Sequence, residues 1–349
     1  MDWVYAFAGL VILLLAGDAL VRGAVNLSLR LGIPALIVSL TVVAFGTSAP
    51  ELLISVRAVM DHVPGLALGN VVGYNIANVL LVLGIPALLT GFSTSQCRSR
   101  KAYLFMIFST LLFIAVCYLG PITWIHGMIL LAALGLVLSD TFLGARADRR
   151  IRKSEEAACA ISPDLEVADD DMPWWQVLVF LGLGLVGLPL GADLLVDGAT
   201  HIARDFGVSE TVIGLTLVAV GTSLPELATT VMAARQNHAD VALGNVIGSN
   251  MFNLLAIIGI ASFFGDIPVG DGLLGFDLWV MLGASLLIAP IVFLHWNITR
   301  LWGLGLSAAY GLYVFAVLTD GASDPARAGH RRWKTPGAGD GAPSGAARP

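Results

Sequence analysis

The chain has 349 residues, of which 57% are hydrophobic and 13% are charged, and its mean hydropathy is +0.83. A soluble domain carries about 25% charged residues, so this composition excludes an ordinary soluble protein and indicates one embedded in a lipid bilayer. The net charge is −6 and no basic face is visible, which argues against binding to nucleic acid.

Apolar runs of about 20 residues, long enough to cross a bilayer, recur along the chain. The first run follows Met-Asp-Trp without a basic region, so it is predicted to be a membrane helix rather than a cleaved signal peptide. The runs predict an all-α membrane protein with ten transmembrane helices, near residues 3–21, 33–60, 65–91, 102–119, 122–143, 174–196, 208–234, 240–265, 273–295 and 300–319.

Two segments are predicted to lie outside the membrane. Residues 144–173 are strongly charged and form a linker between a first unit, 1–143, and a second, 174–319. Residues 320–349 are rich in Gly, Ala, Pro and Ser, which predicts a disordered tail. The run Asp169–Asp171 is interpreted as solvated charge within the linker.

The basic residues of the short loops predict an orientation, because Lys and Arg favour the cytoplasmic side. Arg57 and Arg204 fall on the opposite side from most of them, as does the basic tail. The majority places the N-terminus outside and the linker in the cytoplasm, and it comprises Arg22, Arg30, Arg98, Arg100, Lys101, Arg146, Arg149, Arg150, Arg152, Lys153, Arg235 and Arg300.

The three cysteines, Cys97, Cys117 and Cys159, are far apart and have no paired spacing. This predicts unpaired thiols, with neither a disulfide framework nor a cysteine zinc site.

The chain contains an internal repeat. Segment 41–85 aligns with 216–260 without a gap, at an offset of 175 residues, and the same offset relates Asp18 to Asp193. Each copy has five predicted helices, so the second copy enters the membrane from the opposite face. Inverted repeats of this kind bind substrate near the bilayer midplane at discontinuous helices. The pattern therefore predicts a transporter made of two inverted five-helix repeats, with the second and seventh helices broken.

Each repeat carries a Gly-Thr-Ser-x-Pro-Glu motif, Gly46–Glu51 and Gly221–Glu226. A carboxylate at membrane depth costs at least a few kcal/mol unless it is paired or solvated. The basic residue nearest to Glu51 is Arg57, near a helix end, where it can extend outward to water. We therefore expect Glu51 and Glu226 to face one central cavity, where a cation or a proton neutralises them.

The prolines of the two motifs, Pro50 and Pro225, displace the carbonyls four residues earlier. Freed carbonyls, hydroxyls and carboxylates make an all-oxygen site, which suits a hard cation such as Ca²⁺ rather than copper or zinc. The hydroxyls belong to Thr47, Ser48, Thr222 and Ser223.

The next predicted helix of each copy carries three asparagines, in Gly69–Asn78 and Gly244–Asn253. Tyr74 shares a helix face with Asn78, as Ser249 does with Asn253. Asn78 and Asn253 are predicted to border the cation site. The other four amides are interpreted as helix braces or caps: Asn70, Asn75, Asn245 and Asn250.

The two repeats resemble the cation/Ca²⁺ exchanger superfamily, most closely its prokaryotic sodium/calcium exchanger branch. The resemblance implies a multi-pass protein of a prokaryotic plasma membrane that exchanges Ca²⁺ for Na⁺ by alternating access, without enzymatic activity or a cofactor. It implies that Glu51 and Glu226 bind the two cations in competition. It further implies Ca²⁺ contacts from the carbonyls of Thr47 and Thr222, and flanking Na⁺ sites lined by Ser48, Ser223, Ser249 and the carbonyls of Ala44 and Ala219.

One departure from the resemblance is Tyr74, which stands where the family usually has serine. A phenol does not replace a small hydroxyl ligand, so we expect Na⁺ coupling to be altered, with a Ca²⁺/H⁺ or other cation antiporter as the alternative. Two further alternatives are a cation channel and an intramembrane aspartyl protease built on Asp18 and Asp193. The inverted repeat argues against the protease, because it places these carboxylates near opposite membrane faces.

Overall fold

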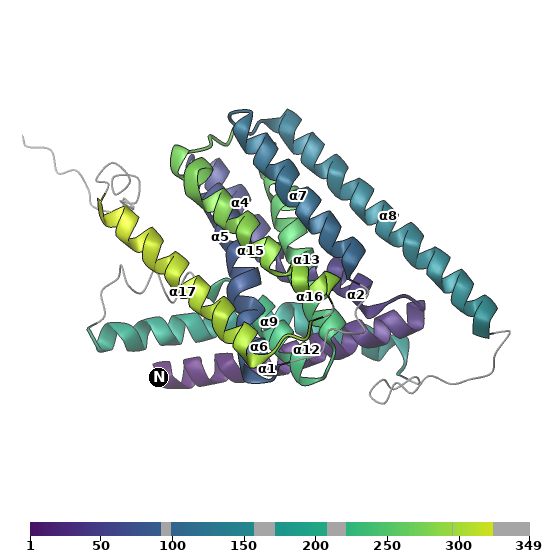
Figure 1. The fold of residues 1–349 in the computed structure, drawn as a ribbon. Coiled ribbons are helices and arrows are strands. Elements are labelled where there is room, and N and C mark those ends of the chain that lie inside the picture. Colours follow the sequence, from purple (N-terminus) through teal and green to yellow (C-terminus); the bar gives the residue numbers. More distant parts are fainter. Residues whose placement is uncertain (92–98, 157–171, 208–220, 295, 324–349) are drawn as a thin grey trace, which may run out of the picture.

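The computed structural model describes residues 1–91, 99–156, 172–207, 221–294 and 296–323. These residues are almost entirely helical (Figure 1), and a single antiparallel bridge among them joins Ile122 to Ile267. Eight of the described helices are long and apolar enough to cross a membrane, or nine when one bent pair is counted as a span.

The first half of the chain contains eight α-helical segments and two π-helical turns, which are marked η. In chain order they are α1 (Asp2–Leu31), α2 (Ala35–Val38), η1 (Ser39–Val43), α3 (Ala44–Thr47), α4 (Ala49–Met60), α5 (Pro64–Ala77), η2 (Asn78–Val82), α6 (Gly84–Leu89), α7 (Arg100–Tyr118) and α8 (Trp124–Glu156).

The second half repeats much of this order. It contains α9 (Trp174–Asp205), α12 (Leu224–Arg235), α13 (Ala239–Phe252), η4 (Asn253–Ile257), α14 (Ile258–Ala261), η5 (Leu273–Asp277), α15 (Leu278–Leu287), α16 (Ala289–Phe293) and α17 (Arg300–Ser323).

Some helices extend beyond the apolar runs that predicted them. The helix α1 continues past Arg22 to Leu31, and α8 continues to Glu156, so residues 144–156 of the predicted linker are helical. A charged residue ends an apolar run in the sequence, but the helix continues through it because the backbone hydrogen bonds are unaffected. The helix α1 stops only at Gly32, which has a φ of 64°, a backbone conformation that glycine adopts without strain.

The helices α1 and α9 lie side by side across one end of the bundle (Figure 1). They pack antiparallel through glycines that leave no room for a side chain. A Cβ placed on Gly9 would lie 2.4 Å from the backbone nitrogen of Leu195, and one on Gly198 would lie 2.6 Å from that of Ala6. Small residues let membrane helices approach this closely, so that dispersion forces hold them together.

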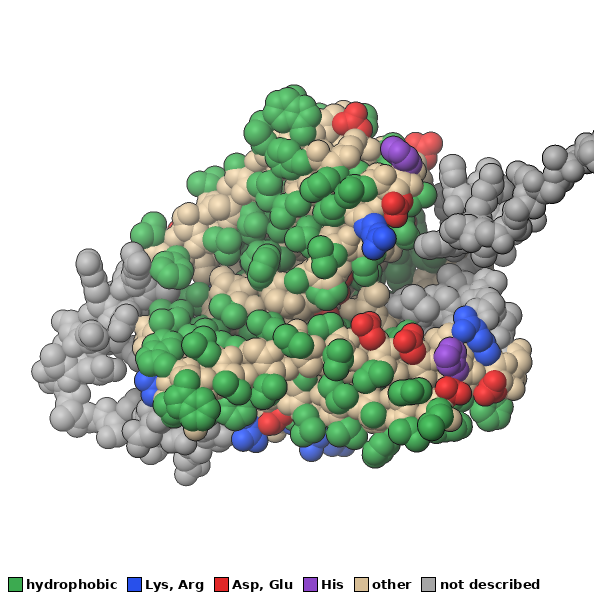
Figure 2. Space-filling model, turned by 180° about the vertical axis from the view of Figure 1, so that it is seen from behind, with side chains coloured by type: hydrophobic (Ala, Val, Ile, Leu, Met, Phe, Trp, Pro, Cys, Tyr) green, Lys and Arg blue, Asp and Glu red, His purple; other side chains and the backbone are tan. Residues whose placement is uncertain are grey.

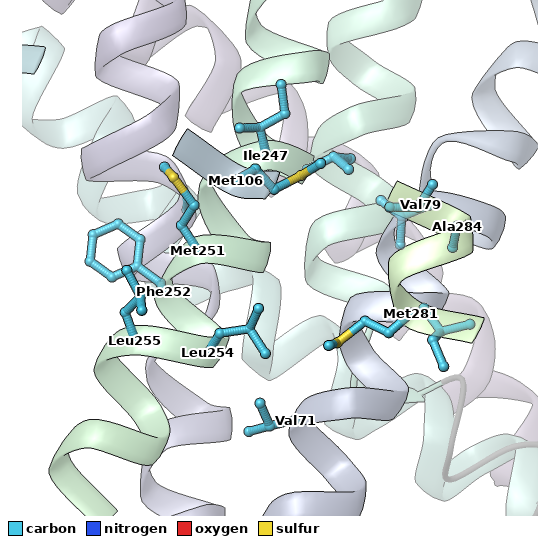
Figure 3. Packing of buried hydrophobic residues seen from close by; sticks show 14 of the residues in the cluster. Val71, Val79, Met106, Ile247, Met251, Phe252, Leu254, Leu255, Met281 and Ala284 are labelled. Atoms are coloured by element: carbon cyan, nitrogen blue, oxygen red, sulfur yellow. The ribbon is translucent and has the colours of Figure 1, made fainter. Parts of the chain in front are cut away.

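The centre of the bundle is formed by α13 and η4, whose membrane-spanning stretch is entirely buried. Figure 3 shows Ile247, Met251 and Leu254 from this stretch packing among side chains of other helices, including Met106 and Met281. By contrast, hydrophobic side chains are spread over the outer face seen in Figure 2. Large exposed apolar residues of this kind suit a surface that faces lipid rather than water.

Candidate cation site

The first motif breaks the helix in which it lies. The segment Ala35–Thr47 and the helix α4 meet at a bend of 45°, and Ser48 stands at the break with a φ of −86° and a ψ of 3°. Pro50 supports the break because it has no N–H to donate to the preceding turn. Ser223 has nearly the same conformation, with a φ of −90° and a ψ of 3°, immediately before α12.

This geometry places one carboxylate in the first turn of each following helix. Glu51 lies in the first turn of α4 and Glu226 in that of α12. The free N–H groups at a helix N-terminus favour negative charge there, so the backbone helps to hold both carboxylates within an apolar bundle.

The two carboxylates are buried and share one site. Their exposed fractions are 4% for Glu51 and 3% for Glu226, and the charge of Glu226 acts on Glu51. The side chain of Thr47, from the other half of the chain, also acts on Glu226. None of the ion pairs formed among the described residues includes either carboxylate. Within the described residues, two buried carboxyl groups therefore meet without an ion pair to a cationic side chain.

Several oxygens around these carboxylates are buried and lack a hydrogen-bond partner among the described residues. Such an atom costs about 1–3 kcal/mol, so their concentration on two broken helices and the helices facing them indicates ligands for a bound ion. The predicted site residues in this group contribute Ser48 Oγ, Glu51 Oε2, Glu226 Oε2, Ser249 Oγ and Asn253 Oδ1.

The remaining predicted ligands fall into two groups. Ala44 and Ser223 are buried, and Thr47 donates from Oγ1 to the Ala44 carbonyl at 3.3 Å. Thr222 is half-buried and makes a side-chain hydrogen bond with Tyr74. Ala219 lies outside the described residues.

The buried amides differ in which of their polar atoms have partners. Asn245 donates to the Glu226 carbonyl at 3.3 Å and to Thr230 Oγ1 at 3.1 Å, and Asn75 donates to the Val71 carbonyl at 2.8 Å. These bonds agree with the interpretation of both amides as braces. The Oδ1 atoms of Asn245 and Asn253 are both unpartnered within the described structure.

π-Helical turns that the sequence did not predict begin at Asn78 and Asn253. Single π-turns inside α-helices are rare and often mark functional sites. Asn78 and Asn253 occupy equivalent positions in the repeat, and this equivalence is the feature of the sequence that marks the two turns.

The central helix α13 packs closely against the first half of the chain. A Cβ on Gly248 would lie 2.6 Å from the Leu40 carbonyl oxygen and 2.7 Å from the Ala44 Cβ. The equivalent glycine of α5 is Gly73, and the positions that correspond to Leu40 and Ala44 in the second copy, 215 and 219, lie outside the described residues.

Comparison with known proteins decides the family. The sequence profile described as "Sodium/calcium exchanger protein" matches residues 1–140 and 176–319. The chain belongs to the sodium/calcium exchanger family. Its relatives include the putative antiporter CaxA of Alkalimonas amylolytica, 36% identical over 81% of this chain and 87% of that protein. They also include the sodium/calcium exchanger MaX1 of Methanosarcina acetivorans, 31% identical over 89% of this chain and 96% of that one.

Solved structures of exchangers share this fold. A structure of the sodium-calcium exchanger NCX_Mj, soaked with Na⁺ and Sr²⁺, has a TM-score of 0.74 and 31% identity, and the match covers 90% of this chain and 97% of that one. The predicted resemblance is thus confirmed, and the exchanger is a multi-pass, all-helical membrane protein with prokaryotic relatives.

Family membership also bears on the protease hypothesis, because the relatives are transporters rather than enzymes. In this exchanger Asp18 accepts from Arg22 Nε at 2.9 Å and from Gln236 Nε2 at 2.7 Å, while Asp193 is exposed on α9. An ion-paired carboxylate of this kind is suited to a structural role and does not share a proton with a second acid.

Proposed function

We propose that the protein exchanges Ca²⁺ for Na⁺ across the membrane by alternating access, with Glu51 and Glu226 as the carboxylates that bind both cations in turn. The observation that carries this proposal is the pair itself. Two buried carboxylates from the two halves of the chain meet at helix breaks, without a described basic partner and each with an unpartnered oxygen. A hard cation, which prefers oxygen ligands, supplies the positive charge that balances the two carboxylates.

The other proposed ligands are carbonyl, hydroxyl and amide oxygens near the two carboxylates. The backbone carbonyls of Thr47 and Thr222 add Ca²⁺ contacts, and Asn78 and Asn253 border the site. Flanking Na⁺ sites are lined by Ser48, Ser223 and Ser249, together with the carbonyls of Ala44 and Ala219. The buried and unpartnered atoms of Ser48, Ser249 and Asn253 support this assignment.

We propose ten spans arranged as two inverted repeats, 1–143 and 174–319, in a prokaryotic plasma membrane, with the N-terminus outside and residues 144–173 cytoplasmic. The 175-residue offset between the two motifs supports the duplication. The seventh span, 208–234, is described here only from Gly221 onward.

Alternating access is supported by the duplication of the motif, because transporters built from inverted repeats expose a fixed site to each side in turn as one repeat rocks against the other.

Radiolabelled Ca²⁺ uptake into proteoliposomes tests the proposal, first under an imposed Na⁺ gradient and then under a H⁺ gradient. Wild type is expected to transport under the Na⁺ gradient, whereas Glu51→Gln and Glu226→Gln reduce the rate by about 100-fold or more. A loss of that size needs only about 2.7 kcal/mol, well below the cost of an unbalanced charge at membrane depth. Asp18→Asn is the control, since it removes a carboxylate outside the site.

Two results would contradict the proposal. If both glutamine variants transport at the wild-type rate, the carboxylates do not bind the cargo. If Ca²⁺ on the far side fails to stimulate uptake, the protein acts as a channel, because only a carrier shows counterflow. Uptake driven by H⁺ but not by Na⁺ would support the alternative Ca²⁺/H⁺ antiport, which Tyr74 favours.

A further inference from the structure

Positions 74 and 249 are equivalent in the repeat, yet the two residues behave differently. Ser249 is fully buried in α13, and its Oγ has no hydrogen-bond partner among the described residues. Tyr74 is half-buried on α5, and its hydroxyl is already engaged. The hydroxyl of Ser249 is free to bind an ion, whereas the hydroxyl of Tyr74 is hydrogen-bonded to Thr222.

The phenol of Tyr74 extends into the cation site. It makes a side-chain hydrogen bond with Thr222, and the charges of both Glu51 and Glu226 act on it. It therefore crosses from the first half of the chain to the second. A serine at this position would end a whole aromatic ring short of Thr222 and would leave that volume to an ion.

The charge of the site limits how many cations it holds. The carboxylates of Glu51 and Glu226 together carry two negative charges, which one Ca²⁺ or two monovalent cations neutralise. A third monovalent cation would leave a net positive charge in an apolar bundle, which is costly unless neutral oxygens solvate it. Ser249 supplies such an oxygen on one flank, and on the other flank the ring of Tyr74 takes the place of a ligand.

We propose that Tyr74 fills the cation subsite equivalent to the one beside Ser249, so that the protein exchanges two monovalent cations for each Ca²⁺ and moves no net charge. This inference rests on the proposed function and adds its stoichiometry. Tyr74 is then a specificity-determining residue, and Tyr74→Ser should open a subsite for one further Na⁺.

The test is the steady-state Ca²⁺ gradient in proteoliposomes whose membrane potential is set by K⁺ and valinomycin, at constant Na⁺ and H⁺ gradients. Each net charge moved per cycle is worth about 2.3 kcal/mol per 100 mV, which is a change of about 50-fold in the Ca²⁺ ratio. Wild type should show no change with potential. Tyr74→Ser should show the full change of about 50-fold, and Tyr74→Phe, which keeps the ring, should behave as wild type.

A second measurement is needed in case Tyr74→Ser binds Na⁺ but does not transport it. In detergent, the stabilisation by Na⁺ rises with the logarithm of its concentration in proportion to the number of ions bound. Tyr74→Ser should raise that number by one. The inference is overturned if wild type responds to potential by about 50-fold, or if Tyr74→Ser changes neither the potential dependence nor the number of bound Na⁺ ions.

Failure of this inference differs from failure of the proposed function. If Ca²⁺ exchange requires Glu51 and Glu226 but its charge is unaffected by Tyr74→Ser, only the stoichiometry is wrong. If wild type takes up no Ca²⁺ under either gradient, or the glutamine variants retain full uptake, the proposed function itself fails.

Discussion

Asn78 donates a hydrogen bond from its amide nitrogen to the amide oxygen of Asn250, at a distance of 3.1 Å. Asn250 in turn donates to the Asn75 carbonyl at 3.3 Å. These bonds tie the central helix of one half to that of the other beside the carboxylates. Asn253, at the position equivalent to Asn78, has an unpartnered Oδ1 within the described residues, so the amides at the centre of the repeat are not used symmetrically.

The first prediction contrasts Asn250 with Asn253. Asn250→Ala should lower the free energy of unfolding by about 1–3 kcal/mol, because it leaves the buried amide nitrogen of Asn78 without the partner it has in Asn250. Asn253→Ala should change stability little in cation-free buffer but weaken the stabilisation by Ca²⁺. Thermal unfolding in detergent, with Ca²⁺ and with a chelator, measures both effects. Equal behaviour of the two variants would refute their separate roles.

The second prediction concerns the unpartnered hydroxyl of Ser249. Ser249→Ala should leave the protein as stable as wild type, or more so, in cation-free buffer, since it removes a buried polar atom without a partner. The same variant should show a smaller stabilisation by Na⁺. Ser285→Ala is the control: its Oγ donates to the Met281 carbonyl at 2.9 Å, so it should lose about 1 kcal/mol with no change in the Na⁺ response. An unchanged Na⁺ response of Ser249→Ala would contradict the assignment.

The third prediction concerns the close packing of Gly248 on α13. Gly248→Ala should destabilise the protein by about 1–3 kcal/mol, because its Cβ would overlap the backbone oxygen of Leu40. Gly135 is exposed on α8 and has no described atom within 4 Å, so Gly135→Ala is the control and should be neutral or slightly stabilising. Thermal unfolding in detergent compares the two variants, and wild-type stability of Gly248→Ala would contradict the close contact.

The fourth prediction addresses the contact between α1 and α9. Gly9→Ala should lower the unfolding free energy by about 1–3 kcal/mol, since its Cβ would lie 2.4 Å from a backbone atom of Leu195 that cannot move alone. Gly182, on α9, has no described atom within 4 Å. Gly182→Ala should therefore be neutral or slightly stabilising. Comparing the unfolding midpoints of the two variants tests the packing, and an equal loss in both would argue against it.

Much of the site was predictable because its chemistry is local. Glu51 and Glu226 stand out as carboxylates in apolar runs, and Pro50 and Pro225 mark the places where the backbone leaves helical hydrogen bonding. The break at Ser48 confirms this for the first motif. Helix ends were predicted less well, as at α1 and α8, because hydropathy reports contact with lipid and not hydrogen bonding along the helix.

The sequence by itself determined that this is a membrane protein with a duplicated motif of carboxylates, hydroxyls and amides, because composition and repetition need no coordinates to read. Only the tertiary structure decided which polar atoms have partners: Asn250 is engaged, Ser249 and Asn253 keep unpartnered oxygens, and Tyr74 reaches Thr222. The physical reason is that hydrogen bonding and close packing depend on contacts between segments far apart in the chain, which spacing along one repeat does not encode.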